Sequence, residues 1–74
     1  MRTREVIRRM TSLDPAARIV HRDGSHQKWC LAGGSTVIVP VHSRDIPVGT
    51  LRSIERQGER ALGSRWLLRE DGRG

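Results

Sequence analysis

Three short β-prone segments joined by glycine-containing turns constrain the fold of this chain more than any other feature. They span residues 17–22 (ARIVHR), 27–32 (QKWCLA) and 35–40 (STVIVP). The Gly33-Gly34 pair between the second and third segments predicts a hairpin, because both glycines can adopt positive φ. Connections this short join antiparallel neighbours, so we expect a three-stranded meander. In the third segment, the run Val37-Ile38-Val39 indicates burial on more than one face.

An amphipathic segment precedes the strands. Apolar side chains recur in it at helical spacing, and arginines occupy its other faces. The pattern predicts a helix over about residues 4–12. We expect Thr3 to cap this helix, and we expect it to end before Pro15, since a proline disfavours helical geometry at the residue before it.

A second amphipathic segment follows the strands. Residues 41–49 are expected to form a loop, after which Thr50 caps a helix that ends at Gly63. Gly58 lies on the apolar side of this helix, where it would permit a close approach to the sheet. Residues 1–74 therefore predict one α+β domain with the order α-β-β-β-α. Its two helices are expected to pack on one face of a three-stranded antiparallel sheet.

The core of such a domain is small. The chain has 74 residues, of which 35% are hydrophobic, and its two aromatic residues are both tryptophan. We expect Trp29 in the core. Trp66, with Leu67 and Leu68, is expected to latch the core, or alternatively to form an apolar docking strip. A chain this short has little room to enclose a large ligand, so a shallow surface site is expected.

The charge of the chain favours a nucleic acid as its partner. It has 14 Lys and Arg against 8 Asp and Glu, and Lys28 is its single lysine. The planar guanidinium of arginine fits phosphate and stacks on bases. The alternative is that arginine is merely the preferred basic residue of a GC-rich genome.

A membrane location and a disulfide are both disfavoured. No apolar run approaches the roughly 18 residues of a membrane span, and the charged start MRTREVIRRM is unlike a signal peptide. Cys30 is the single cysteine, so it forms no internal disulfide and reads as a small hydrophobe in a reducing cytosol. We therefore expect a cytoplasmic protein.

His26 is the strongest candidate for a chemical role. It follows the polar turn Asp23-Gly24-Ser25 at the start of a strand. RNA carries its own nucleophile, the 2′-hydroxyl, and a neutral histidine can remove its proton near pH 7. Such cleavage needs no metal, and no His/Cys spacing here suits zinc. The alternative is that His26 is a solvated residue at a strand start.

Three residues near His26 are further candidates for a role at the site. Lys28 lies two residues along the strand, hence on the same face, where it would stabilise negative charge or, alternatively, be an ordinary exposed lysine. Ser25 would donate to a phosphate oxygen or, alternatively, bond the backbone of its own turn. His21 is expected to be structural or solvated.

Three stretches together carry a family resemblance. They are REVIRRM at residues 4–10, Gly-Ser-His at 24–26, and VIVPVHSRDIPVGTLRSIERQ at 37–57. With them the chain resembles the HicA toxins of bacterial and archaeal toxin–antitoxin pairs over about residues 3–57. Residues 58–74 then form a C-terminal extension with a frayed end.

The resemblance implies a function and a fold. It implies a fold like that of double-stranded-RNA-binding domains, a ribonuclease activity on mRNA, a HicB-like antitoxin as partner, and no metal or organic cofactor. His26 would carry the activity, and His42 matches the family's Pro-x-His position as an accessory acid, a phosphate contact or a loop residue. Where the family often has arginine, this chain has His21. The expected RNA contacts are Arg22, Gly24, Ser25, Lys28 and Arg44.

Two other functions fit the same pattern. One is a non-catalytic RNA-binding module that uses the same fold and basic face. The other is an inactive member kept for binding its partner. Family resemblance alone does not distinguish them, because related folds carry different functions.

Overall fold

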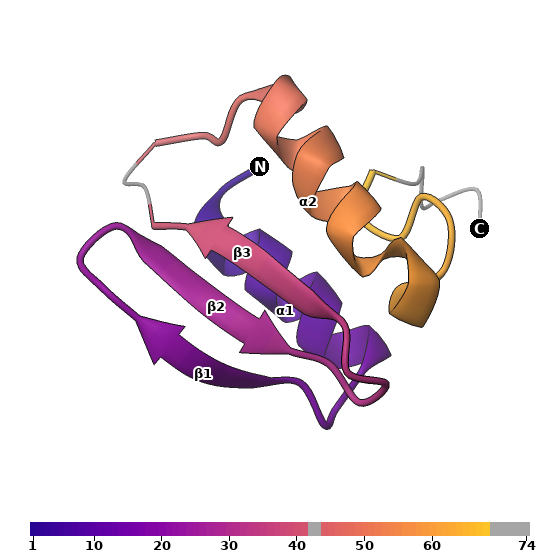
Figure 1. Cartoon of the computed structure of the whole chain (residues 1–74). Helices are drawn as coiled ribbons and strands as arrows, with labels where there is room; N and C mark the ends of the chain where they lie inside the picture. Colours follow the sequence, from indigo (N-terminus) through magenta and orange to yellow (C-terminus); the bar gives the residue numbers. More distant parts are fainter. Residues whose placement is uncertain (42–43, 69–74) are drawn as a thin grey trace.

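The fold has the expected order α-β-β-β-α. The computed structural model describes residues 1–41 and 44–68. Its elements are α1 (Thr3–Leu13), β1 (Arg18–Arg22), β2 (His26–Cys30), β3 (Thr36–Pro40) and α2 (Val48–Leu62). The strands form an antiparallel sheet in the order β1-β2-β3. Figure 1 shows α1 behind this sheet and α2 beside β3.

The core lies between the sheet and the helices. Trp29, Val37 and Val39 point from the sheet into it, and the expectation that Trp29 is a core residue is confirmed. Both helices bury their apolar faces there, as expected. The other buried hydrophobic residues are Val6, Met10, Leu31, Ile46, Leu51, Ile54, Trp66 and Leu67. One face of the sheet is thereby covered, and the other is open.

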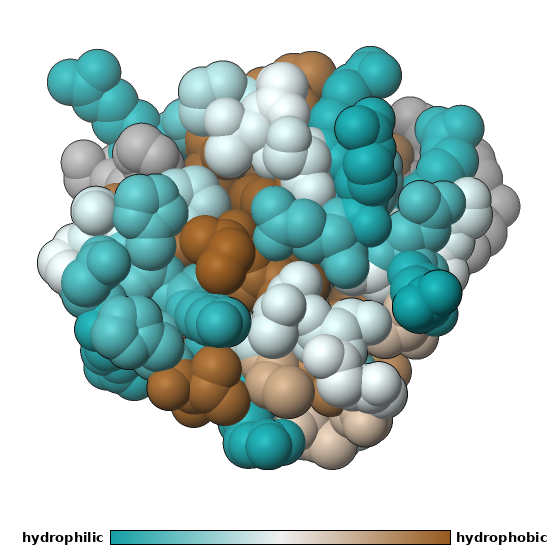
Figure 2. Space-filling model, in the orientation of Figure 1, coloured by the Kyte–Doolittle hydropathy of each residue, from teal (hydrophilic) through white to brown (hydrophobic). Residues whose placement is uncertain are grey.

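The expectation that β3 is buried on more than one face is wrong. Val37 and Val39 are fully buried, whereas Ile38 between them is 38% exposed. The burial alternates because no described element covers the face of the sheet opposite α1. Figure 2 views this open face, where hydrophobic patches lie among mainly hydrophilic side chains. Val20 and Ile38 are exposed hydrophobic residues of β1 and β3.

The two helix starts differ from those expected. Arg2, not Thr3, precedes α1, and its backbone N–H donates to the Glu5 carboxylate at 2.8 Å. The Thr3 hydroxyl instead donates to the Pro40 carbonyl oxygen at 2.8 Å, which ties α1 to the end of β3. Helix α2 begins at Val48, before Thr50, because the carbonyl oxygen of Pro47 accepts the first hydrogen bond of the helix. The Leu51 N–H donates to the carbonyl oxygen of that proline at 3.0 Å.

The segment after α2 latches the core, as the first interpretation of Trp66 predicted. Trp66 is only 2% exposed, and its indole N–H donates to the Glu55 carbonyl oxygen at 2.7 Å. The Glu55 carboxylate accepts from the N–H groups of Leu67 and Leu68 at 3.1 and 2.7 Å. Gly58 permits a close approach to Trp66 rather than to the sheet, since a Cβ there would lie 3.1 Å from the indole nitrogen.

In the turn between β2 and β3, only one of the two glycines adopts the positive φ expected of both. Gly34 has a φ of +94°, whereas Gly33 does not adopt positive φ. The Leu31 N–H donates to the Ser35 carbonyl oxygen at 2.8 Å and closes a longer loop than a two-residue hairpin.

Two expectations concern the chain as a whole. The expected frayed end over residues 70–74 lies outside the described residues. In the ranges 1–41 and 44–68, neither helix combines the length and the apolar character that crossing a membrane requires.

Candidate active site

The turn between β1 and β2 is built around the carboxylate of Asp23. Its Oδ1 accepts hydrogen bonds from the backbone N–H groups of Ser25 and His26, both at 2.8 Å. The backbone N–H of Asp23 donates to the His26 carbonyl oxygen at 3.0 Å. One acidic side chain thus fixes the backbone from which His26 projects.

The same hydrogen bonds keep Asp23 ionised. The bond from the Ser25 N–H, and next the bond from the His26 N–H, lower the pKa of Asp23 below its ordinary value of 3.8. Attraction to His26 and a contact with the Ser25 hydroxyl act in the same direction. A carboxylate that accepts backbone hydrogen bonds is stabilised in its charged form. Near neutral pH, Asp23 is therefore an acceptor only.

The imidazole of His26 is oriented by one of its two nitrogens. Its Nδ1 lies 3.1 Å from the Ser25 hydroxyl oxygen, which in turn lies 3.4 Å from Asp23 Oδ1. The side chain is 54% exposed. Among the residues that the structure describes, none is hydrogen-bonded to Nε2 of His26. This nitrogen is free to meet a substrate from solvent.

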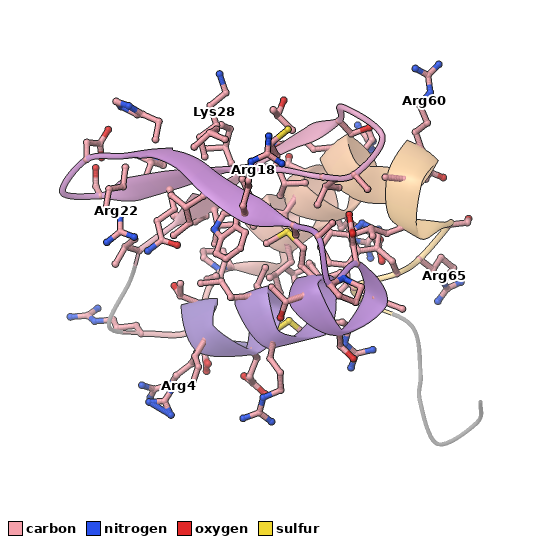
Figure 3. The ribbon with its side chains drawn as sticks, turned by 90° about the horizontal axis from the view of Figure 1, so that it is seen from below. Arg4, Arg18, Arg22, Lys28, Arg60 and Arg65 are labelled. Atoms are coloured by element: carbon pink, nitrogen blue, oxygen red, sulfur yellow. The ribbon has the colours of Figure 1, made fainter. Side chains whose placement is uncertain are left out.

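Lys28 shares the open face of the sheet with His26. The two residues are two positions apart on β2, and both are exposed. Figure 3 shows Lys28 pointing away from α1, on the open side of the sheet. The structure therefore brings together Ser25, His26 and Lys28 of the predicted site.

Of the other predicted site residues, Gly24 belongs to the same turn, whereas Arg22 faces the opposite side of the hairpin. Arg22 pairs with Gln27, and Figure 3 shows it on the α1 side of the hairpin rather than beside Lys28. Gly24 lies in the exposed turn, with open space around it. Arg44 is an exposed residue before α2, and His42 lies outside the described residues.

Two residues of the site were not assigned to it from the sequence. Asp23 had a readable signal, because an aspartate before Gly-Ser often bonds the backbone N–H two residues on. His21 pairs with Lys28, so it also lies on the open face. Its placement depends on an irregularity in β1 that the sequence does not reveal.

The site is an open surface, as expected for so small a domain. A hollow between α1 and the end of α2 lies away from His26, which is not among its lining residues. Its lining includes Leu13, Leu62 and Trp66. No group of three metal-ligating side chains occurs within residues 1–41 and 44–68.

The role of Asp23 in the turn predicts a pH dependence. The ionised form of Asp23 is the one that accepts the hydrogen bonds of the turn. Its contribution to the stability of the turn is therefore complete above pH 3.8 and is lost as the pH falls through the lower folded-state pKa. The amide proton chemical shifts of Ser25 and His26 should report this loss in an NMR titration. Asp23→Asn keeps an acceptor oxygen but has no proton to gain, so it should show no such step. An identical step in this variant would contradict the assignment.

A comparison with protein families gives a match over most of the chain. A family model described as the HicA toxin of bacterial toxin–antitoxin systems matches residues 3–59, which is more than half of the chain. A search of curated proteins finds no match. The matched range contains the Asp23 turn, β2 and most of α2.

Proposed function

Because the chain belongs to the HicA toxin family of bacterial toxin–antitoxin systems, we propose that it is an endoribonuclease that cleaves mRNA with His26 as its general base. Family membership makes it a toxin with a cognate antitoxin. The observation that supports the catalytic proposal is the exposed imidazole of His26, oriented through Nδ1 beside Ser25 and Asp23.

The hydrogen-bond chain suggests which nitrogen acts as the base. Asp23 is ionised and can only accept, so the Ser25 hydroxyl donates to it. The Ser25 oxygen then accepts a hydrogen bond from Nδ1–H of His26. That tautomer leaves a lone pair on Nε2, which removes the proton of the RNA 2′-hydroxyl. The nearby carboxylate stabilises the imidazolium that forms.

Lys28 supplies positive charge at the reacting phosphate. Attack by the 2′-oxygen adds negative charge to the phosphoryl oxygens, and a fixed cation beside them lowers the barrier. Lys28 lies on the His26 face, two residues along the strand. The nucleophile belongs to the substrate, so the reaction as proposed uses no metal-bound water and no cofactor.

The remaining predicted residues are proposed to bind flanking RNA. Ser25 and Gly24 would contact the phosphate backbone at the turn, while Arg22 and Arg44 would hold the strand on either side of it. Arg22 faces the α1 side of the hairpin, so it would contact RNA that passes around the hairpin end. His42 remains a proposed accessory acid or phosphate contact.

The antitoxin is proposed to be HicB-like and to cover the open face of the sheet. This face combines the cation of Lys28 with the exposed apolar side chains of Val20 and Ile38. An acidic partner with a complementary apolar strip would bury both and block access to His26. The toxin and antitoxin would then act in the cytoplasm, where mRNA is translated.

Incubation of the purified protein with RNA in EDTA tests the proposed activity. We expect cleavage to persist, and the products to carry a 2′,3′-cyclic phosphate or 3′-phosphate and a 5′-hydroxyl, because the 2′-oxygen is the nucleophile. Products with 5′-phosphate ends, or cleavage abolished by the chelator, would contradict the mechanism. RNA binding without any cleavage would favour the non-catalytic RNA-binding module.

A further inference from the structure

Strand β1 contains a bulge that changes which of its residues reach the open face. Ile19 pairs with Trp29, but the next pair along the strands is His21 with Lys28. Val20 is therefore an extra residue on β1, with no partner of its own on β2. The bulge lies in the middle of the strand, directly beside the candidate site.

The bulge brings His21 to the face that carries His26. In a regular ladder, Val20 would lie opposite Lys28, and His21 would lie opposite Gln27 with its side chain on the α1 side. With one residue inserted, His21 lies directly opposite Lys28, and residues in direct register share a face. His21 is exposed, as are Lys28 and His26.

His21 and His26 then form a diagonal pair across β1 and β2. Lys28 is opposite His21 and two residues from His26. The Cα atoms of diagonal neighbours of this kind are about 7–8 Å apart, within reach of long or aromatic side chains. That separation leaves room for one phosphoryl group with a hydrogen bond to an imidazole on each side.

We propose that His21 is a second catalytic residue, the general acid that protonates the leaving 5′-oxygen. The inference rests on the proposed ribonuclease function. In the step, His26 takes the proton of the 2′-hydroxyl while the 2′-oxygen forms its bond to phosphorus. The bond from phosphorus to the 5′-oxygen breaks, and the imidazolium of His21 gives its proton to that oxygen. The products are a 2′,3′-cyclic phosphate and a 5′-hydroxyl, with one proton moved from His21 to RNA and one from RNA to His26.

The neighbouring cationic side chains are less suited than His21 to the role of general acid. Arg18 and Lys28 also lie on or beside the open face, opposite Cys30 and His21 respectively. A guanidinium or an ammonium gives up its proton near pH 7 far less readily than an imidazolium does. These two side chains can stabilise the charge of the phosphorane but are poor proton donors to the leaving oxygen.

The test compares two substrates whose leaving groups differ in their need for a proton. One is a dinucleotide, whose 5′-alkoxide must be protonated. The other is a nucleoside 3′-phosphate ester of para-nitrophenol, whose leaving group departs without protonation. We expect His21→Ala to lower dinucleotide cleavage by about 10²–10⁴-fold and to leave cleavage of the activated ester within a few-fold of wild type. His26→Ala should lower both rates.

Matched variants show whether His21 acts as a proton donor or only as a positive charge that binds phosphate. His21→Arg keeps a positive charge but cannot serve as the acid, so it should be as slow on the dinucleotide as His21→Ala. Full rescue by His21→Arg would overturn the inference, as would equal losses on both substrates or a selective loss on the dinucleotide in His42→Ala alone. Thermal melting establishes that each variant is folded. A wild-type protein that cleaves neither substrate would overturn the proposed function as well, whereas unchanged rates in His21→Ala overturn only the role of His21.

Discussion

His26→Ala is expected to lower the rate of RNA cleavage by about 10²–10⁴-fold without unfolding the protein. The rate falls because no other described side chain is oriented at the turn to remove the 2′-proton. The fold survives because the His26 side chain is 54% exposed and its ring bonds the Ser25 hydroxyl of the turn beside it. Single-turnover cleavage of a labelled RNA in EDTA, with far-UV circular dichroism on the same samples, measures both quantities.

The chain offers a control on the same face. Thr36 is an exposed residue of β3, opposite Cys30 on β2, and lies outside the proposed machinery. Thr36→Ala should cleave at the wild-type rate. RNA binding by His26→Ala should also persist, since the arginines and Lys28 remain. Cleavage by His26→Ala at the wild-type rate would exclude His26 as the base and leave the family membership untouched.

The sequence predicted the order of elements because each signal behind it is local. Helical spacing before Asp14 and the glycine turns between β-prone runs fix neighbouring segments without reference to the rest of the fold. The common face of His26 and Lys28 follows from the alternation of a strand. These expectations needed no knowledge of tertiary packing.

The expectations that failed depend on tertiary context. Ile38 sits in a continuous apolar run, but no described layer covers its face, so it is partly exposed. The Thr3 hydroxyl bonds the end of β3 instead of its own helix, which only the folded chain can reveal. The bulge at Val20 shifts the pairing by one residue, and nothing in the composition of β1 marks that position.

The Trp66 latch predicts the largest effect on stability. Trp66→Ala is expected to cost about 3–5 kcal/mol, the usual range for truncating a buried tryptophan. The indole is almost fully buried, and its N–H donates to the Glu55 carbonyl oxygen. A 74-residue domain has a total stability of only roughly 4–11 kcal/mol. The variant should therefore be partly or wholly unfolded, which urea denaturation followed by circular dichroism would measure.

A milder substitution of the same tryptophan separates the apolar contact from the hydrogen bond. Trp66→Phe keeps most of the apolar contact but loses the hydrogen bond to Glu55, so its cost should fall below that of Trp66→Ala. A cost under about 1 kcal/mol for Trp66→Ala would place this side chain outside the core.

The close contact between Gly58 and Trp66 makes the latch testable by a double-mutant cycle. A methyl group at Gly58 would lie 3.1 Å from the indole nitrogen and 3.2 Å from two of its ring carbons. Gly58→Ala should therefore destabilise the wild-type protein, although alanine is the better helix former by about 1 kcal/mol. With Trp66→Phe in place, the smaller ring leaves room for the methyl group, and the same substitution should cost less or become stabilising. Strictly additive effects would contradict the contact, because two residues in direct contact are expected to show coupling.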